Sequence, residues 1–441
     1  MNNKERMELA KWASDFALKH GASEAAVSIS RSRSVQVEVR EQRIETIRES
    51  TDNNLSLQIY RDHKFSSHST NNLQKRQLER FISEAVEATG YLSPDEDRSL
   101  PDPALYPDDL SVDLGLTDPQ HGAVSPEFRV QRAMETEQMI RDANVGAEVL
   151  SVSARFNDNA SEGVRVHSNG FMGETSTTSF STGATLSVMD QGARPAGSFF
   201  ASSRFLNELP QANDIARQTI SDTVRQLGQS PAPSGRYVMI IDNRVAGNII
   251  FRLFQPLSAR NIQQRNSYLI DMIDQRIASE KLTIIDNPFI NGGLGSRLFD
   301  GEGIAARERT IIDQGVLKTY LVDNYYGRKL GLTPNGGSTS NVIMALGSRD
   351  QDQIIAAQDK AILITSFAGG NANSTTGDFS FGIAGQLIEN GRIVRAVNEM
   401  NISGNMKNLW NQLAENGNDP YPYSSLQSPT MVFRDVDFSG L

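Results

Sequence analysis

The side chains that could bind a metal ion or act as nucleophiles are sparse in this sequence. The chain has no cysteine, which removes thiolate ligands and thiol nucleophiles. Its only histidines all lie in the first 170 residues, so the C-terminal part cannot form a serine–histidine pair of its own. The nearest two are five positions apart on an alternating strand and face opposite sides, so we expect no metal site there. The histidines are His20, His63, His68, His121 and His167.

Carboxylates on two glycine-rich loops are the remaining candidates for acid–base or metal chemistry. The first loop, Asn291–Gly303, reads "NGGLGSRLFDGEG", and the second, Phe367–Gly382, reads "FAGGNANSTTGDFSFG". Neither has the Gly-Lys-Ser/Thr of a phosphate-binding loop. Two interpretations stay open, because the glycines can accept positive φ in ordinary turns or the loops can supply site residues. On the second interpretation, the candidates to line a substrate cleft are Asp300, Glu302, Asn371, Asp378 and Phe379.

The elements that must position these residues follow a repeated order of helix, strands and helix. Residues 3–20 place apolar side chains at helical spacing, and the following residues alternate with the period of two that is typical of strands, as in "SVQVEVREQRIETI". A second helix ends near Gly90. The order repeats after a connection rich in Pro and Asp, because Ser125 and Pro126 open a helix and strands then dominate to about Phe205. The helix "DIARQTISDTVRQL" closes this second unit.

A third part begins after the short linker "GQSPAPSGR" and is rich in strands and glycine turns. The turns "HSNGF" in the middle part and "IDQG" and "IENG" in the third part are typical of hairpins. We therefore predict an α+β fold in which two helix–sheet–helix units with largely antiparallel sheets precede a strand-rich C-terminal domain. The predicted domains are an N-terminal α+β domain at 1–110, a middle α+β domain at 111–230 and a C-terminal domain at 231–441.

Composition limits the classes of function. The chain has 441 residues, 43 Lys and Arg against 53 Asp and Glu, and a net charge of −10. This acidic balance, with no local cluster of basic residues, does not favour nucleic-acid binding. No apolar run is long enough to cross a membrane, and the N-terminus begins directly with an amphipathic helix. We therefore expect a cytoplasmic protein without a membrane partner.

Several longer stretches carry a specific resemblance. They are "GGLGSRLFDGEGIAARERTIIDQGVLKTYLVDNYYGRKLGL", "TTGDFSFGIAGQLIENGRIVRAVNEMNISGNM" and the ending "SLQSPTMVFRDVDFSG". They resemble the C-terminal domain of the TldD/TldE (PmbA) family, whose members are described as proposed modulators of DNA gyrase and as peptidase-related. Weaker similarity upstream, through "HSNGF" and "LSLQIYRDHKFSSHST", extends the resemblance over nearly the whole chain.

One helix decides between the two branches of that family. In the TldD-like branch, the helix after the "YVMII"-type strand carries His-Glu, three residues and His, which bind a catalytic metal together with a C-terminal cysteine. Here Gln255 and Pro256 stand in place of His-Glu, and Arg260 stands in place of the second His. An amide and a guanidinium cannot replace neutral imidazoles on zinc, and proline cannot act as a base. The chain is therefore similar to the TldE/PmbA branch, which lacks the metal motif.

The resemblance implies a non-catalytic subunit of a TldD/TldE-type metalloprotease that acts on peptides or unfolded proteins. Zinc is then expected in a TldD-like partner and no cofactor in this chain, which when isolated could form a homodimer. Two alternatives stay open: the chain is itself a metallopeptidase that uses Asp300, Glu302 or Asp378, or it modulates DNA gyrase by direct contact. The resemblance also predicts that the two glycine-rich loops meet in one cleft beside the helix that contains Gln255.

Overall fold

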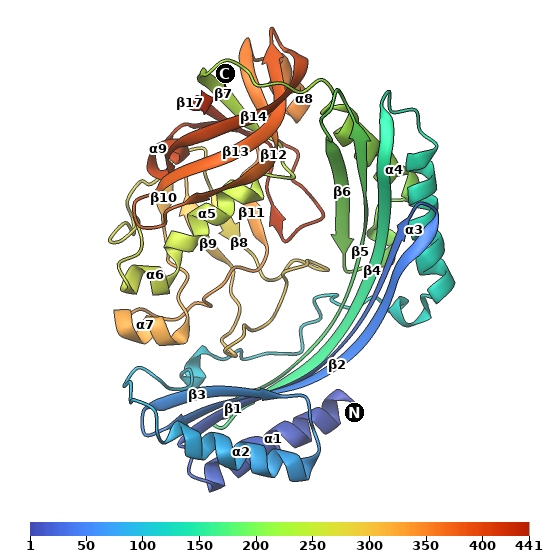
Figure 1. The fold of residues 1–441 in the computed structure, drawn as a ribbon. Helices are drawn as coiled ribbons and strands as arrows, with labels where there is room; N and C mark the ends of the chain where they lie inside the picture. Colours follow the sequence, from blue (N-terminus) through green and yellow to red (C-terminus); the bar gives the residue numbers. More distant parts are fainter. Residues whose placement is uncertain (441) are drawn as a thin grey trace.

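The computed structural model describes residues 1–440 and has a mixed α+β architecture (Figure 1). A long curved sheet forms one side of the molecule, and a strand-rich C-terminal body, which includes a small barrel, lies in its concavity. Among residues 1–440, the helices are too short or too polar to cross a lipid bilayer.

The long sheet has six antiparallel strands in the order β3-β2-β1-β4-β5-β6. Strands of the two predicted helix–sheet–helix units join where Ala26–Arg40 pair with Ser153–His167, so the units share one sheet instead of building two. This pairing covers the edges that two separate sheets would leave open. The strands are β1 (Glu24–Arg40), β2 (Arg43–Arg61), β3 (Lys64–Thr70), β4 (Glu148–His167), β5 (Met172–Met189) and β6 (Ala196–Ser203).

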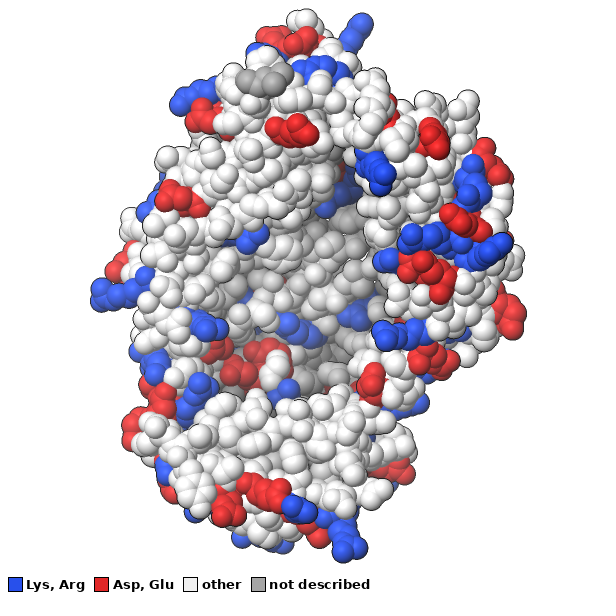
Figure 2. Space-filling model, in the orientation of Figure 1, with Lys and Arg blue, Asp and Glu red and all other residues white. Residues whose placement is uncertain are grey.

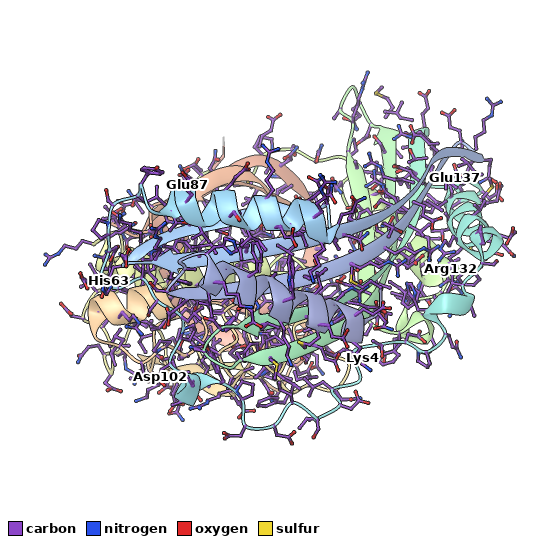
Figure 3. All side chains as sticks on the ribbon, turned by 90° about the horizontal axis from the view of Figure 1, so that it is seen from below. Lys4, His63, Glu87, Asp102, Arg132 and Glu137 are labelled. Carbon is purple, nitrogen blue, oxygen red and sulfur yellow. The ribbon has the colours of Figure 1, made fainter. Side chains whose placement is uncertain are left out.

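Within residues 1–440, four helices cover the outer, convex face of the long sheet. They are α1 (Asn3–Lys19), α2 (Lys75–Thr89), α3 (Pro126–Arg141) and α4 (Ala212–Val224). Strand alternation sends Val27 and Ile29 of β1 into a core with α1 and α2, and it sends Val37 and Val39 against Ala133 of α3. Figure 3 shows α1 and α2 side by side across one end of this face, with Arg132 and Glu137 marking α3 at the other end.

The C-terminal body contains a barrel. Its strand order is β14-β13-β12-β7-β17-β15, and a further pairing of β14 with β17 closes the first five strands of that order into a ring. Met239 and Ile241 of β7 pack on the helix α5 (Gly247–Leu257) in the main core, whereas Ile240 packs on the helix α8 (Gln351–Ala356). The strands are β7 (Gly235–Ile241), β12 (Lys360–Ala372), β13 (Asp378–Glu389), β14 (Arg392–Asn405), β15 (Leu413–Asn416) and β17 (Met431–Ser439).

A smaller five-stranded sheet with the order β10-β9-β8-β11-β16 completes this body. The strands are β8 (Ile284–Asp286), β9 (Arg309–Asp313), β10 (Val316–Leu317), β11 (Val342–Met344) and β16 (Leu426–Gln427), and three further helices are α6 (Ala259–Gln263), α7 (Asn324–Leu330) and α9 (Met406–Asn411). Of these three helices, α6 contacts α5 and α7, and α9 contacts β14 and β17 of the barrel.

Local sequence patterns account for most of these boundaries. Ser125 caps α3 by accepting the N–H of Phe128, as the Ser-Pro pair predicts. The three predicted hairpin turns connect β4 to β5, β9 to β10 and β13 to β14. In the first of them Gly170 has a φ of +111°, a conformation that a residue with a Cβ rarely adopts. The predicted order of helix, strands and helix, repeated twice, is confirmed.

Candidate functional site

The positions of the family's metal motif lie on two helices. Helix α5 ends at Leu257, and Ser258 has extended backbone angles before α6 begins. The hydroxyl of Ser258 accepts the N–H of Asn261 and so caps α6. Gln255 therefore belongs to α5 and Arg260 to α6, and the side chains of both are exposed. The motif's spacing on one continuous helix is not preserved.

The donors at these positions do not fit a zinc ion. Gln255 offers a weak amide oxygen, Pro256 is buried and has no side-chain donor, and Arg260 carries a permanent positive charge. Within residues 1–440, the structure brings no three His, Asp or Glu side chains into a group that could hold a metal ion. His63 and His68 also have separate contacts, since the first lies 3.2 Å from Glu96 and the second 2.8 Å from Ser66.

Asp300 organises the first glycine-rich loop from a buried position. One of its carboxylate oxygens accepts the N–H groups of Glu302, at 2.8 Å, and of Ile304, at 3.0 Å. These two bonds fix the tight turn that ends at Gly303, whose φ is +78°. Burial raises the pKa of Asp300, although both N–H donors oppose the shift. The Asp300 carboxylate therefore stabilises the conformation of this loop.

Glu302 is the carboxylate whose protonation is closest to neutral pH. Burial raises its pKa to about 7, and the nearby negative charges of Asp300 and Asp323 act in the same direction. The N–H of Asn324, at the start of α7, donates to Glu302 at 2.8 Å and opposes the shift. The group can therefore exchange a proton near pH 7, which is the property required of a general acid or base.

The long sheet contributes a basic residue to this acidic loop. Arg165 of β4 lies with Phe299 and Asp300 around a cavity of about 310 Å³. Burial lowers the pKa of Arg165, and the charges of Asp300 and Glu302 counteract that effect. Arg165 is not among the site residues predicted from the sequence. A signal for it was present in the sequence, because Arg165 follows the small neutral residues Ser161 and Gly163 on the inner face of β4.

His167 lies next to this cluster but cannot act as a base at neutral pH. Burial, assisted by the charge of Arg165, lowers its pKa to about 3. Its Nδ1 lies 3.0 Å from the hydroxyl of Tyr106, and its ring contacts Phe171. His167 therefore serves as a neutral packing residue between β4 and the connection that contains Tyr106.

The second glycine-rich loop has a different environment. Asp378 is exposed and accepts hydrogen bonds from Asn405 and Thr376, which lower its pKa. Asn371 is exposed in the hairpin of β12 and β13, whereas the Phe379 ring is buried in the core against Phe381.

This second loop lies beside the segment that follows α6, since the N–H of Tyr268 donates to the carbonyl of Ser374 at 2.9 Å. Asp300 and Asp378 share no hydrogen-bond partner within residues 1–440. The structure thus brings Asp300 and Glu302 together with Arg165 and gives Asp378 its own partners. A common cleft for the two loops stays a prediction.

A deep hollow separates the concave face of the long sheet from the C-terminal body. Figure 2 shows that the visible wall of this hollow is mostly neither acidic nor basic, with isolated charged side chains near its lower end and many more around the rim. The cavity beside Arg165 and Asp300 is lined partly by Ser28, Ser30 and Thr175 of the concave face. The acidic loop therefore meets the long sheet at one end of the concave face.

Comparisons with known proteins agree with these features. Family models match three consecutive regions: PmbA/TldA metallopeptidase domain 1 at 25–89, the central domain at 119–227 and the C-terminal domain at 234–440. The metalloprotease PmbA of Escherichia coli O157:H7 is 27% identical over 433 residues, which cover 96% of this chain and 94% of that protein.

Solved structures extend the comparison to the whole fold. The crystal structure of a proposed modulator of DNA gyrase from Bacteroides thetaiotaomicron is 38% identical, covers 100% of both chains and superposes with a TM-score of 0.97. The structure of TldE from Thermococcus kodakarensis has a TM-score of 0.86 at 20% identity and covers 98% of this chain and 100% of that one. With these matches and with no metal motif on α5 and α6, the chain belongs to the PmbA/TldD metallopeptidase family, in its PmbA (TldE) branch.

Proposed function

We propose that this chain is a non-catalytic subunit that assembles with a TldD-like metallopeptidase and helps it to act on peptides or unfolded proteins. The observation that supports this most directly is the pair of positions Gln255 and Arg260. Neither side chain is a zinc ligand, and the break at Ser258 places them on different helices. The metal and the hydrolytic step would then reside in the partner, and this chain would contribute substrate contacts.

Two measurements test this proposal. Elemental analysis of the chain, purified without added metal, should give well under one equivalent of zinc. Cleavage of reduced and carboxymethylated lysozyme, an unfolded probe, should require a TldD-like partner together with this chain and should not occur with this chain alone. One equivalent of tightly bound zinc together with activity of the isolated chain would overturn the proposal.

The carboxylates of the first loop support a second candidate, in which the chain is itself a hydrolase. The supporting observation is that Glu302 has a pKa of about 7 beside Asp300 and Arg165. The substitution Glu302→Gln separates the two proposals, because it retains an acceptor for the N–H of Asn324 but removes the proton-transfer group. Unchanged cleavage by the assembly that contains E302Q supports the subunit role, whereas a loss of at least a hundredfold in kcat, with KM unchanged, supports the hydrolase.

A further inference from the structure

The inner face of the long sheet carries a continuous surface of small neutral side chains. It consists of every second residue of β1 from Ser28 to Gln36, of β4 from Asn157 to Gly163 and of β5 from Thr175 to Ser181, and we call it the neutral floor. Every one of these residues is Ser, Thr, Asn, Gln or Gly. All except Gly163 are at least partly exposed.

Register and packing establish that these residues share one face. Directly paired residues in a sheet project to the same side, and the pairings run in rows such as Ser32–Ser161–Thr177. The intervening residues, including Val27 and Ile29, pack under the outer helices. The neutral floor is therefore the face that borders the hollow in Figure 2.

Charged groups flank the neutral floor but do not enter it. At one end lie Arg165 and Asp300, and at the other end Arg155 of β4 forms a 2.8 Å ion pair with Glu38 of β1. Along the side edge, Asp52 and Arg48 of β2 pair with Ser32 and Gln36 and project to the same face. A sheet face that is simply solvated usually carries Lys, Glu and Arg as well as Thr. The absence of such residues from three adjacent strands indicates a surface that is suited to close contact with an uncharged molecule.

The hydrogen-bonding groups of the neutral floor are held in place by one another. The amide of Asn159 donates to the Ser32 hydroxyl at 2.8 Å, and the amide of Asn157 donates to the Ser181 hydroxyl at 3.2 Å. The Oδ1 atom of Asn157 is buried and accepts no hydrogen bond from the described residues. A cavity of about 170 Å³, which Arg48 of β2 also lines, opens beside it. The floor therefore presents oriented hydroxyl and amide groups with unused capacity.

We propose that the neutral floor binds an extended, uncharged polypeptide segment, an inference that rests on the proposed role in peptide handling. Backbone N–H and C=O groups and small polar side chains of such a segment find matching acceptors and donors on the floor. A charged segment that lies on the three floor strands would lose hydration without meeting a floor residue of opposite charge. A nucleic acid would meet no basic residue on the floor, and the whole chain has a net charge of −10.

Charge substitutions on the neutral floor test this inference with the full chain. Thr177→Lys with Ser179→Lys introduces two positive charges, and Thr177→Glu with Ser179→Glu introduces two negative charges. The probes are three labelled 12-residue peptides of neutral, acidic and basic composition, and the readout is fluorescence anisotropy. The unsubstituted chain should bind the neutral peptide best. The lysine variant should bind the acidic peptide about tenfold more tightly than the unsubstituted chain does, and the glutamate variant should do the same for the basic peptide.

The matched control places the same charges on the other face of the long sheet, on β2 and β5. Thr51 and Ser176 are exposed on the outer face, where Ser176 pairs with Glu162. Thr51→Lys with Ser176→Lys should leave the peptide preference unchanged. The inference fails if this control changes the preference as much as the floor variant does, if the unsubstituted chain binds none of the peptides, or if a neutral glucan oligosaccharide displaces the neutral peptide at lower concentration than unlabelled peptide.

Cleavage assays with a TldD-like partner separate this inference from the proposed function. If the assembly cleaves the neutral peptide but the lysine variant of the floor leaves KM for all three peptides unchanged, the floor is not the binding surface and the subunit role stands. If the isolated chain shows the predicted binding preferences but no assembly cleaves peptides, the floor stands and the subunit role fails.

Discussion

At the residue scale, Glu302 makes the stability of the fold depend on pH. Its pKa of about 7 is above the ordinary glutamate value of 4.5, so the folded state holds a proton that the unfolded chain releases between those two values. The stability associated with this proton is present in full below pH 4.5 and is lost as pH rises through 7. Glu302→Gln removes this titrating group. As pH rises from 5 to 8, the free energy of unfolding of the variant should therefore increase by about 2 kcal/mol relative to that of the unsubstituted protein.

Chemical denaturation of both proteins at pH 5, 6, 7 and 8 measures this difference. Glu174→Gln, at an exposed position of β5, is the control for the loss of one carboxylate. A gap between E302Q and the unsubstituted protein that stays constant from pH 5 to pH 8 would contradict a buried, proton-holding Glu302.

The sequence could identify the two carboxylates of the first loop but not their environment. The glycine spacing around Asp300 and Glu302 marks a turn-rich loop, and both residues are in fact close to each other. Burial raises both pKa values, and the charge of Arg165, which is more than a hundred residues away in the chain, opposes the shift. Such a contact depends on tertiary packing, so a local pattern cannot reveal it. Phe379, which the sequence suggested as a cleft residue, likewise has an environment set by tertiary packing, because its ring is buried against Phe381.

At the element scale, the break between α5 and α6 determines what the motif positions can do. Restoring the metal residues by Gln255→His, Pro256→Glu and Arg260→His should not create a tight zinc site. The two imidazoles would stand on different helices, because Ser258 ends α5 and caps α6, and the chain has no cysteine to complete the set. Elemental analysis should therefore give less than about 0.2 equivalents of zinc.

A TldD-like chain provides the positive control. Its own metal motif is first changed to Gln, Pro and Arg, and the triple substitution then restores His, Glu and His. This restored chain should bind zinc again. One equivalent of zinc in the triple variant of this chain would show that α5 and α6 can merge into one helix.

The sequence predicts the start of this element well, since "YVMII" and the apolar spacing that follows match β7 and α5. The break is less visible, because Ser258 acts as a cap only if α5 has already ended at the turn containing Pro256.

At the scale of the whole molecule, the joining of the two helix–sheet–helix units into one sheet creates the concave face. Each unit is predictable from its own periodicity, as the helices and hairpins show. The pairing of β1 with β4 is not, because it connects residues that are more than a hundred positions apart and leaves the local alternation unchanged. The curved sheet therefore follows from a long-range contact between patterns that are each visible in the sequence.

The contact between this sheet and the C-terminal body should depend on the absence of a side chain at Gly173. A Cβ atom there would lie 2.7 Å from the Phe299 ring and 2.8 Å from the Phe171 ring, so Gly173→Ala should displace the first glycine-rich loop and cost about 2 kcal/mol. Thermal denaturation should show the loss, and hydrogen exchange should speed up in residues 297–303. Gly301→Ala, in the same loop but with open space around its Cβ, should change neither the thermal stability nor the exchange rate.

Phe299→Leu added to Gly173→Ala should restore part of the stability, because a smaller side chain frees the space that the methyl group needs. If the double variant is no more stable than Gly173→Ala alone, the Phe299 contact does not connect the sheet to the C-terminal body.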